Sequence, residues 1–394
     1  MTVLRPENAH QARLLRLLRD DGPRSRAQLG DGLELSRSKL AVEIDRLVAR
    51  GIVDTAGLAA SRGGRPSSIV RIARQTRFLG IDIGATSIDA AVTDGELRVL
   101  SHVAEPMDVR RGPEEVISRA LELVGKLRAD DVAPGFVGAG VGVPGPVSFA
   151  EGVPVSPPIM PGWNLFPVRE TFSAELGCPV LVDNDVNIMA LGEKHAGNAR
   201  SADDFLFIKI GTGIGCGIVV DGRVYRGVSG CAGDIGHIRV DDGGPICSCG
   251  NVGCLEAFFG GTALARDALS AARAGRSEEL ARRLAGAGTL TAVDVADAAA
   301  AGDPVAVGMI RDGGHRVGQV LAGLISFFNP GLVVIGGGVA GIGHALLAEI
   351  RAVVYRRSLP LATGNMPIVL SELGGRAGVI GATRLVSDYV FATA

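Results

Sequence analysis

The sequence predicts an α/β protein with a small basic head at its N-terminus and a larger body of buried strands and glycine turns. Two observations lead to this fold class. Residues 1–77 contain 15 Lys or Arg against 8 Asp or Glu, whereas the remainder of the 394-residue chain contains 25 against 34. Beyond residue 77, short apolar segments run repeatedly into glycine-rich turns. A basic segment joined to an acidic body is typical of a polyanion-binding unit attached to a second unit.

The composition is that of an ordinary soluble protein. The chain has 47% hydrophobic and 21% charged residues, and its length predicts two or three domains. The N-terminus lacks the apolar core of a signal peptide. The most apolar long stretch, residues 331–348, contains six glycines and a histidine, which disfavours a membrane span. We therefore expect a cytoplasmic protein without a membrane partner.

The first 50 residues predict three helices. Leucines at positions 14, 15, 17 and 18 give residues 9–20 one apolar face, which Asp21-Gly22-Pro23 ends. Ser25 can cap a second short helix, and a break is expected at Gly32 to Leu35. Ser36 can cap a third helix that runs to Arg50, with apolar residues at i, i+4, i+7 and i+8.

The third helix has the features of a DNA-recognition helix. Its first turn, Ser36, Arg37, Ser38 and Lys39, offers hydroxyls and two cations to phosphates and base edges. Two strands follow, residues 52–54 and 68–72, around a loop in which glycines flank Arg62 and Arg65, and Arg65 can enter a minor groove. This order predicts a winged helix-turn-helix domain over residues 1–75. The alternative is a solvated basic hairpin on a helical bundle.

The body repeats a strand-and-turn pattern that suits phosphate binding. A buried strand ending in Asp82 runs into a turn with Gly84 and Thr86, and residues 90–93 return as a second strand. A carboxylate there can hold Mg²⁺, and the turn can present N–H groups to phosphate. The pattern recurs after residues 205–210, at Gly211, Thr212, Gly213 and Gly215, and after residues 332–335, at Gly336, Gly337 and Gly338. Because a strand rather than a helix follows Gly217, a dinucleotide-binding motif is disfavoured.

A polar pair follows another buried strand. Residues 179–183 lead into Asn184 and Asp185, and a helix through Met189 and Glu193 follows. A carboxylate in this place can act as the general base that takes a proton from a sugar hydroxyl. The alternative is that either residue only caps the helix.

Four soft ligands predict a metal site. His237, Cys247, Cys249 and Cys254 provide one imidazole and three thiolates, a set that suits tetrahedral Zn²⁺. The alternative is three reduced cysteines in a loop. We interpret Cys178, Cys216 and Cys231 as small buried hydrophobic residues.

Two motifs together resemble the ROK family (repressors, open reading frames and sugar kinases). The match is Gly-x-x-Gly-x-Ala-Gly-acid-x-Gly-His at residues 227–237 and Cys-x-Cys-Gly-x-x-Gly-Cys-x-Glu at residues 247–256. The segment Arg-Gly-Gly-Arg-Pro at residues 62–66 looks like the wing of that family's repressors. The resemblance implies an actin/hexokinase-like body of two lobes, residues 76–185 and 186–394, with a C-terminal helix that can return to the first lobe.

The resemblance also implies roles for individual residues. Asp185 takes the position of the catalytic base, which would be vestigial in a regulator. The implied sugar contacts are Asn164, Asn184, Asp185, Asp234, His237 and Glu256. The turns at Gly84 and at residues 211–217 would hold ATP phosphates, and Gly336 to Gly338 would border the adenosine.

Two departures from the family's kinases weaken the expectation of catalysis. Ala85 places a methyl group where the kinases usually have glycine, and Asp234 stands where they usually have glutamate. We therefore expect a sugar-responsive transcriptional regulator, most simply a repressor, that binds operator DNA as a homodimer or dimer of dimers and contains structural Zn²⁺. The alternative is an ATP- and Mg²⁺-dependent hexose or N-acetylhexosamine kinase that keeps a DNA-binding domain. A regulator of this kind that responds to another effector is a further possibility.

Overall fold

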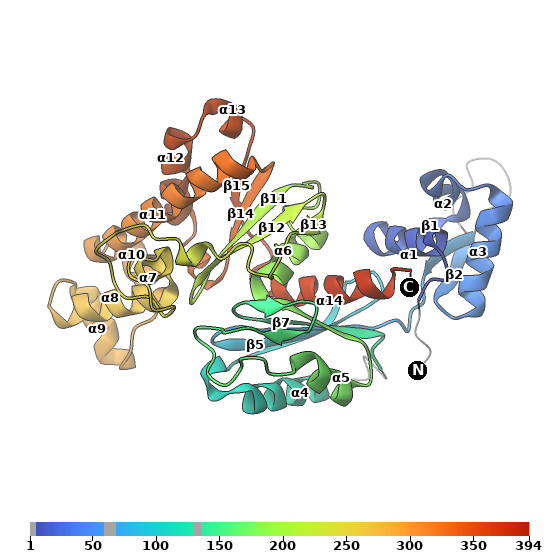
Figure 1. The fold of residues 1–394 in the computed structure, drawn as a ribbon, viewed down its shortest axis with the longest axis horizontal. Coiled ribbons are helices and arrows are strands. Elements are labelled where there is room, and N and C mark those ends of the chain that lie inside the picture. Colours follow the sequence, from blue (N-terminus) through green and yellow to red (C-terminus); the bar gives the residue numbers. More distant parts are fainter. Residues whose placement is uncertain (1–4, 59–67, 130–134, 394) are drawn as a thin grey trace.

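The computed structural model describes residues 5–58, 68–129 and 135–393. It has three parts, which Figure 1 shows as a helical head and two lobes, each lobe with its own sheet. Arg62 and Arg65 lie outside the described residues.

The head consists of three helices and a small antiparallel sheet with the strand order β1-β3-β2. Its elements are α1 (Ala9–Asp21), β1 (Arg24–Ser25), α2 (Arg26–Leu33), α3 (Arg37–Ala49), β2 (Val53–Leu58) and β3 (Ser68–Ile72). Ser25 and Ser36 cap α2 and α3 as predicted. The expected break at Gly32 begins two residues too early, because α2 continues to Leu33 and ends where Glu34 adopts a left-handed conformation with φ of 56°.

The first lobe is built on a five-stranded mixed sheet with the order β10-β7-β4-β5-β6. Its elements are β4 (Phe78–Ile83), β5 (Ser87–Thr93), β6 (Val99–Pro106), η1 (Val109–Arg111), α4 (Pro113–Ala129), β7 (Gly138–Val143), β8 (Val147–Ser148), β9 (Val153–Pro154), α5 (Val168–Leu176) and β10 (Val180–Asn184). The helix α6 (Asp185–Ala196) follows β10 directly.

The second lobe repeats this topology around the order β13-β12-β11-β14-β15. In both sheets a hairpin and a third antiparallel strand lie on one side of the first strand, and two parallel strands lie on the other. The recurrence of strand and glycine turn in the sequence corresponds to this repeat. The elements are β11 (Phe205–Ile210), β12 (Ile214–Val220), β13 (Arg223–Val224), η2 (Ile235–His237), α7 (Leu255–Phe259), α8 (Gly261–Arg273), α9 (Glu278–Ala287), α10 (Ala292–Ala300), α11 (Pro304–Phe328), β14 (Leu332–Gly336), η3 (Gly338–Ile342), α12 (His344–Arg357), α13 (Pro360–Thr363), β15 (Ile368–Leu370) and α14 (Arg376–Val390).

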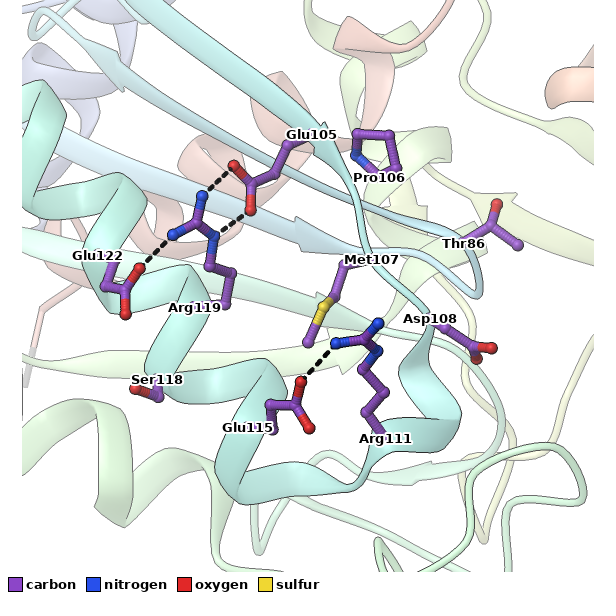
Figure 2. Close-up of a pocket in the computed structure, with 10 residues that line it drawn as sticks. All are labelled: Thr86, Glu105, Pro106, Met107, Asp108, Arg111, Glu115, Ser118, Arg119 and Glu122. Atoms are coloured by element: carbon purple, nitrogen blue, oxygen red, sulfur yellow. Dashed lines mark hydrogen bonds and ion pairs between the residues drawn. The ribbon is translucent and has the colours of Figure 1, made fainter.

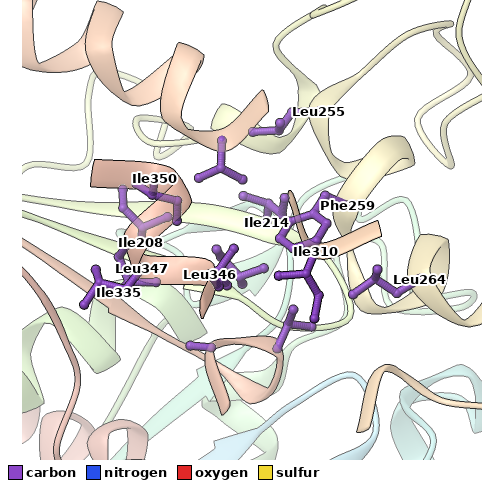
Figure 3. Close-up of a cluster of buried hydrophobic side chains, with 14 of the residues drawn as sticks. Ile208, Ile214, Leu255, Phe259, Leu264, Ile310, Ile335, Leu346, Leu347 and Ile350 are labelled. Carbon is purple, nitrogen blue, oxygen red and sulfur yellow. The ribbon is translucent and has the colours of Figure 1, made fainter. Parts of the chain in front are cut away.

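The core of the second lobe lies between its sheet and the helices α7, α8, α11 and α12. Figure 3 shows Ile208, Ile335, Phe259, Ile310 and Leu346 converging from these elements. Gly313 on α11 makes this packing possible, because a Cβ atom there would lie 1.7 Å from the Phe259 ring. Close packing of this kind fixes α7, the helix that carries Glu256.

Two helices exchange between the lobes. The helix α6 leaves the first lobe and packs on β11 and β12 of the second, while α14 leaves the second lobe and packs on β4 and β7 of the first. The two helices also pack on each other with their backbones in contact. A Cβ atom at Gly381 of α14 would lie 1.6 Å from the Ile188 carbonyl oxygen, and one at Gly192 of α6 would lie 2.1 Å from that of Ala377.

The C-terminal helix also joins the head to the body. In Figure 1, α14 runs from the lobes toward the head, and α3 lies on the side of the head away from the body. Val386, Val390 and Phe391 belong to the same buried cluster as the leucines of α1, and Phe391 meets Phe78 edge to face at 5.7 Å. The head and α14 therefore share one hydrophobic core.

In the part of the chain that the structure describes, we find no helix with the length and hydropathy needed to cross a membrane.

Candidate functional site

A cavity of about 290 Å³ opens between the two lobes, and we call it the cleft. The volume is near the lower end of small-molecule pockets, which run from about 300 to 1,000 Å³. Five of the six sugar contacts expected from the sequence line the cleft. These are Asn184, Asp185, Asp234, His237 and Glu256. They come from β10, α6, the loop before η2, η2 itself and α7, so both lobes contribute polar groups to one site.

Asn184 and Asp185 lie where β10 passes into α6. The Asn184 side chain accepts a hydrogen bond from the Val186 N–H at 2.9 Å and donates one to the Gly145 carbonyl oxygen at 2.8 Å. Asn184 therefore caps the helix, as the simpler interpretation held, and its amide still has one N–H to donate in the cleft. Asp185 begins the helix and is buried.

Lys209, a residue that the sequence analysis did not single out, faces Asp185 across the lobe boundary. Its ammonium group hydrogen-bonds to Asp185 Oδ2, and its side chain lines the cleft. Burial opposes the charge, but Asp185 and Asp82 outweigh it and raise the pKa of Lys209. The signal in the sequence was its place as the charged residue of the otherwise apolar strand Phe205–Ile210.

Asp82 is partly buried and does not belong to the lining of the cleft. Its Oδ1 atom is shielded from solvent and has no hydrogen-bond partner among the described residues, and Gly378 at the start of α14 leaves room for the carboxyl group. Burial, together with the nearby Asp185 carboxylate, raises the pKa of Asp82 to about 8, against the opposing effect of Lys209. An ammonium group already engages Asp185, so a Mg²⁺ ion at this carboxylate would have to displace Lys209.

The second glycine turn is shaped by Glu256. Its Oε2 atom accepts a hydrogen bond from the Ile214 N–H at 2.9 Å, and a Cβ atom at Gly213 would lie 2.2 Å from Oε2. Position 213 must therefore be glycine, because the Glu256 carboxylate occupies the space that a side chain would need. Thr212, Gly213 and Gly215 line the cleft.

His237, Cys247, Cys249 and Cys254 lie together beside the cleft, with their donor atoms all within 4.8 Å of one another. Cys247 Sγ is 3.4 Å from His237 Nδ1, and Cys249 Sγ is 3.8 Å from Cys254 Sγ. Zn–S bonds of about 2.3 Å give tetrahedron edges of about 3.8 Å, so the four donors fit one metal ion. His237 Nε2 points the other way, 3.7 Å from Asp234 Oδ1. The histidine therefore connects the cysteine cluster to the cleft.

Several expected residues do not line the cleft. Asn164 is exposed and accepts a hydrogen bond from the Ser156 N–H at 2.8 Å, so it holds a loop whose Ser156 does line the cleft. At the first turn the cleft is lined by Ala85, not by Gly84 or Thr86. Gly336 to Gly338 and Gly211 also stand outside the lining, and Gly337 packs on the Ile210 carbonyl group.

Thr86 instead borders a separate groove between β6, η1 and α4 (Figure 2). The charged groups of this groove are already paired, since Arg119 donates to Glu105 at 2.8 Å and Arg111 donates to Glu115 at 2.7 Å.

The cysteine interpretation needs one correction. Cys178 and Cys216 are buried as expected, and burial raises the pKa of their thiols to about 11 and about 12. Cys231 is exposed and lines the cleft. It lies in the glycine-flanked loop before η2, where the chain has no hydrophobic layer to cover it.

The first turn of α3 forms an exposed cationic surface on the head. Ser36, Arg37, Ser38 and Lys39 are all exposed, and Ser36 Oγ accepts from the Lys39 N–H at 3.3 Å. Arg37 and Lys39 form no ion pair with any described residue, whereas Arg24, Arg26 and Arg50 of the head pair with carboxylates.

Known proteins resemble this chain over most of its length. The model of the ROK family matches residues 78–389. The xylose repressor of Caldicellulosiruptor bescii is 28% identical over 376 residues, which cover 95% of this chain and 94% of that protein. A ROK family transcriptional regulator, described as a homolog of the E. coli MLC protein, has a TM-score of 0.80 at 28% identity and covers 97% of this chain and 96% of its own. A ROK family glucokinase from Streptomyces griseus, in complex with glucose and AMPPNP, has a TM-score of 0.69 at 32% identity and covers 78% of this chain and 98% of its own.

Proposed function

The chain belongs to the ROK family, and on that premise we propose that it is a sugar-responsive transcriptional repressor. The head, residues 1–75, binds operator DNA as a winged helix-turn-helix. The cleft between lobes 76–185 and 186–394 binds a monosaccharide. The repressor and regulator relatives match nearly the whole chain, and the glucokinase matches less of it, which favours the regulator.

One observation carries this proposal: α6 and α14 connect the cleft to the head. Asp185 in the cleft begins α6, whose backbone touches that of α14 at Gly192 and Gly381. The far end of α14 is held to α1 by Arg19, whose Nη1 donates to Ser387 Oγ at 2.9 Å and Asp388 Oδ1 at 2.6 Å. A shift of α6 on ligand binding would therefore reach the head through packed backbone rather than through a flexible linker.

For the DNA side, we infer that Arg37 and Lys39 contact phosphates or base edges, together with Ser36 and Ser38. Unpaired cations at the exposed start of a helix suit this role. Arg62 and Arg65 of the wing are proposed to reach the minor groove. One short head offers little surface for specific binding, so we propose that two copies bind a palindromic duplex.

For the metal, we propose one structural Zn²⁺ per chain. The four donors are three thiolates and one imidazole, which zinc prefers in closed sites. Bound there, zinc would fix the loop that carries Cys249 and, through His237, the wall of the cleft. We expect Cys249→Ser to lose the metal and the sugar response, and elemental analysis of protein purified without chelator measures the first. A zinc content near zero in the wild-type protein would contradict the assignment.

For the ligand, Asn184, Asp234, His237 and Glu256 are the proposed hydroxyl contacts. The relatives named for xylose and glucose make D-xylose and D-glucose the first probes. A ligand that binds only the folded state raises its melting temperature, so a thermal-shift panel of monosaccharides identifies the effector.

Operator titrations with and without that sugar then test the function. We expect sugar to weaken DNA binding by about 5–150-fold. Asp185→Asn and Glu256→Gln should reduce this response and leave the sugar-free DNA affinity intact. Unchanged DNA affinity in the presence of a bound sugar would refute the repressor proposal.

A further inference from the structure

Two glycines on the neighbouring strands leave space for the Lys209 side chain. In the sheet of the second lobe it pairs in register with Gly215 of β12 and Gly336 of β14, so both cross-strand neighbours lack a side chain. It is also one of only four lysines in the chain. The long side chain is thereby free to run along the sheet into the cleft, where it reaches Asp185.

The ammonium group lies among carboxylates. Besides its hydrogen bond to Asp185, it interacts electrostatically with Asp82 and Glu256. Three carboxylates line the cleft, those of Asp185, Asp234 and Glu256. Among the described residues that line it, Lys209 is the one lysine or arginine. Without it, acidic groups from both lobes would face one another across a narrow site with no cation between them.

This arrangement differs from what phosphoryl transfer requires. A general base needs a free oxygen to take the hydroxyl proton, and metal ions normally neutralise the developing phosphate charge. Here Asp185 Oδ2 is already engaged by the ammonium group. Asp82 does not belong to the lining of the cleft. A polyphosphate would also meet an excess of carboxylates.

We propose that Lys209 is the resident cation of the cleft, which stands in for a metal ion, holds Asp185 as a hydrogen-bond acceptor, and makes the site a receptor for an uncharged sugar without nucleotide. The inference rests on the proposed function for the identity of the ligand. The role of Lys209 as a cation is independent of that identity and can be tested without sugar.

The first test uses magnesium alone as the probe. Full-length, zinc-loaded wild type, Lys209→Met, Lys209→Arg and the control Lys194→Met are melted in MgCl₂ and in NaCl of equal ionic strength. Lys194 is a suitable control because it pairs with Asp203 at the surface, near the other end of α6. We expect Mg²⁺ to raise the melting temperature of Lys209→Met by about 2 °C or more and that of the other three proteins by no more than NaCl does.

The second test measures sugar binding by calorimetry. Wild type should bind D-glucose or D-xylose equally well with and without Mg²⁺ and a non-hydrolysable ATP analogue. Lys209→Met should bind about tenfold more weakly, Mg²⁺ should recover part of the loss, and Lys209→Arg should stay near wild type. Because the cleft has excess negative charge, glucose 6-phosphate should bind more weakly than glucose.

The outcomes separate the two proposals. A Lys209→Met protein that ignores Mg²⁺, or a wild type that needs Mg²⁺ and nucleotide to bind sugar, overturns the resident-cation role. Tighter binding of glucose 6-phosphate overturns the ligand class. If Lys209→Met responds to Mg²⁺ but no monosaccharide binds any of the proteins, the cation role stands and the sugar function fails. Should Lys209→Met not fold, Lys209→Gln takes its place, and the wild-type arms remain decisive.

Discussion

The two ends of α6 carry two ion-pair clusters of different character. At the start of the helix, Asp185 meets Lys209 beside an open cleft. Near its end, His195 accepts from Arg384 at 3.3 Å, and Arg384 donates to Asp20 at 3.1 Å. Asp20 is also paired with Arg19, whose side chain is fully buried against α14. The first cluster borders space that a ligand can enter, and the second is packed between the head and the body.

The difference indicates different roles for the two regions, ligand binding at the first cluster and transmission at the second. A hydrogen-bonded pair beside a cavity can rearrange when hydroxyl groups enter, whereas a closed cluster moves only with the elements that carry it. Because α6 and α14 touch along their backbones, a change at Asp185 has a continuous route to Arg19. We therefore regard α6 and α14 as the element that sugar and operator would both bias.

The largest effect should come from breaking the helix contact between the two clusters. In Gly381→Ala the new methyl carbon would lie 1.6 Å from the Ile188 carbonyl oxygen, and neither backbone can move aside without shifting a helix. We expect a loss of about 3 kcal/mol in the free energy of unfolding, measured by urea denaturation. The matched control is Gly323→Ala in α11, where nothing lies within 4 Å. Gly323→Ala should raise the free energy of unfolding by about 0.5–1 kcal/mol. Equal stabilities of the two variants would refute the close packing.

The next effect should follow from opening the second cluster, which we call the junction cluster and which contains Arg19, Asp20, His195 and Arg384. Arg19→Met removes a buried donor from Ser387 and Asp388, and Asp388 keeps only Arg384, which should cost about 2 kcal/mol. We also expect the variant to bind sugar normally while its DNA affinity responds less to sugar. Calorimetry and operator titration measure these separately. Arg19→Lys keeps one donor and should retain part of the response. A full sugar response in Arg19→Met would show that the junction cluster transmits nothing.

The smallest effect concerns the pH dependence of stability. His195 at the end of α6 and Asp82 near Lys209 should change the stability in opposite directions as pH changes. Burial, followed by Arg384 and Arg19, lowers the pKa of His195 to about 4, against Asp20 and Asp388. Between pH 4 and the ordinary histidine pKa of 6.5 the unfolded state binds more protons, so stability from His195 is lost as pH falls. Asp82 has a raised pKa of about 8, so the folded state binds more protons between pH 3.8 and 8, and stability falls as pH rises.

Each contribution is at most about 1.4 kcal/mol per pH unit. Thermal melts across pH should therefore show near-cancellation from pH 4 to 6.5 and a decline from 6.5 to 8. His195→Asn keeps an acceptor for Arg384 but removes the titrating imidazole. In this variant the stability should therefore fall with rising pH already between pH 4 and 6.5, because only Asp82 contributes there. Asp82→Asn should remove the decline. Identical pH profiles for wild type and both variants would contradict the assignment.

Local features of the fold could be read from the sequence. The caps at Ser25 and Ser36, the strands around each glycine turn, and the spacing of His237 and the three cysteines depend on residues close together in the chain. The shared core of head and α14 depends on Arg19 and Asp388, which are 369 positions apart. No local pattern indicates such a pair.

The candidate site divides in the same way. The residues after β10 and the two signature motifs converge on the cleft, but the pairing of Lys209 with Asp185 depends on how the fold brings the ends of β10 and β11 together. A glycine turn has two possible causes, a bound phosphate or a close neighbour within the fold. Gly213 and Gly215 are small because Glu256 and Val186 pack against them, and a sequence cannot distinguish this cause from a ligand.

The most direct test of the account is reciprocal linkage between cleft and head. Thermodynamics requires that sugar and operator change each other's affinity by the same factor. We predict that wild type shows an equal weakening, within about 5–150-fold, when DNA is titrated with sugar present and when sugar is titrated with DNA present. In Gly381→Ala or Arg19→Met, if folded, both factors should approach one. A wild-type protein that binds sugar and operator together with no change in either affinity would contradict the account.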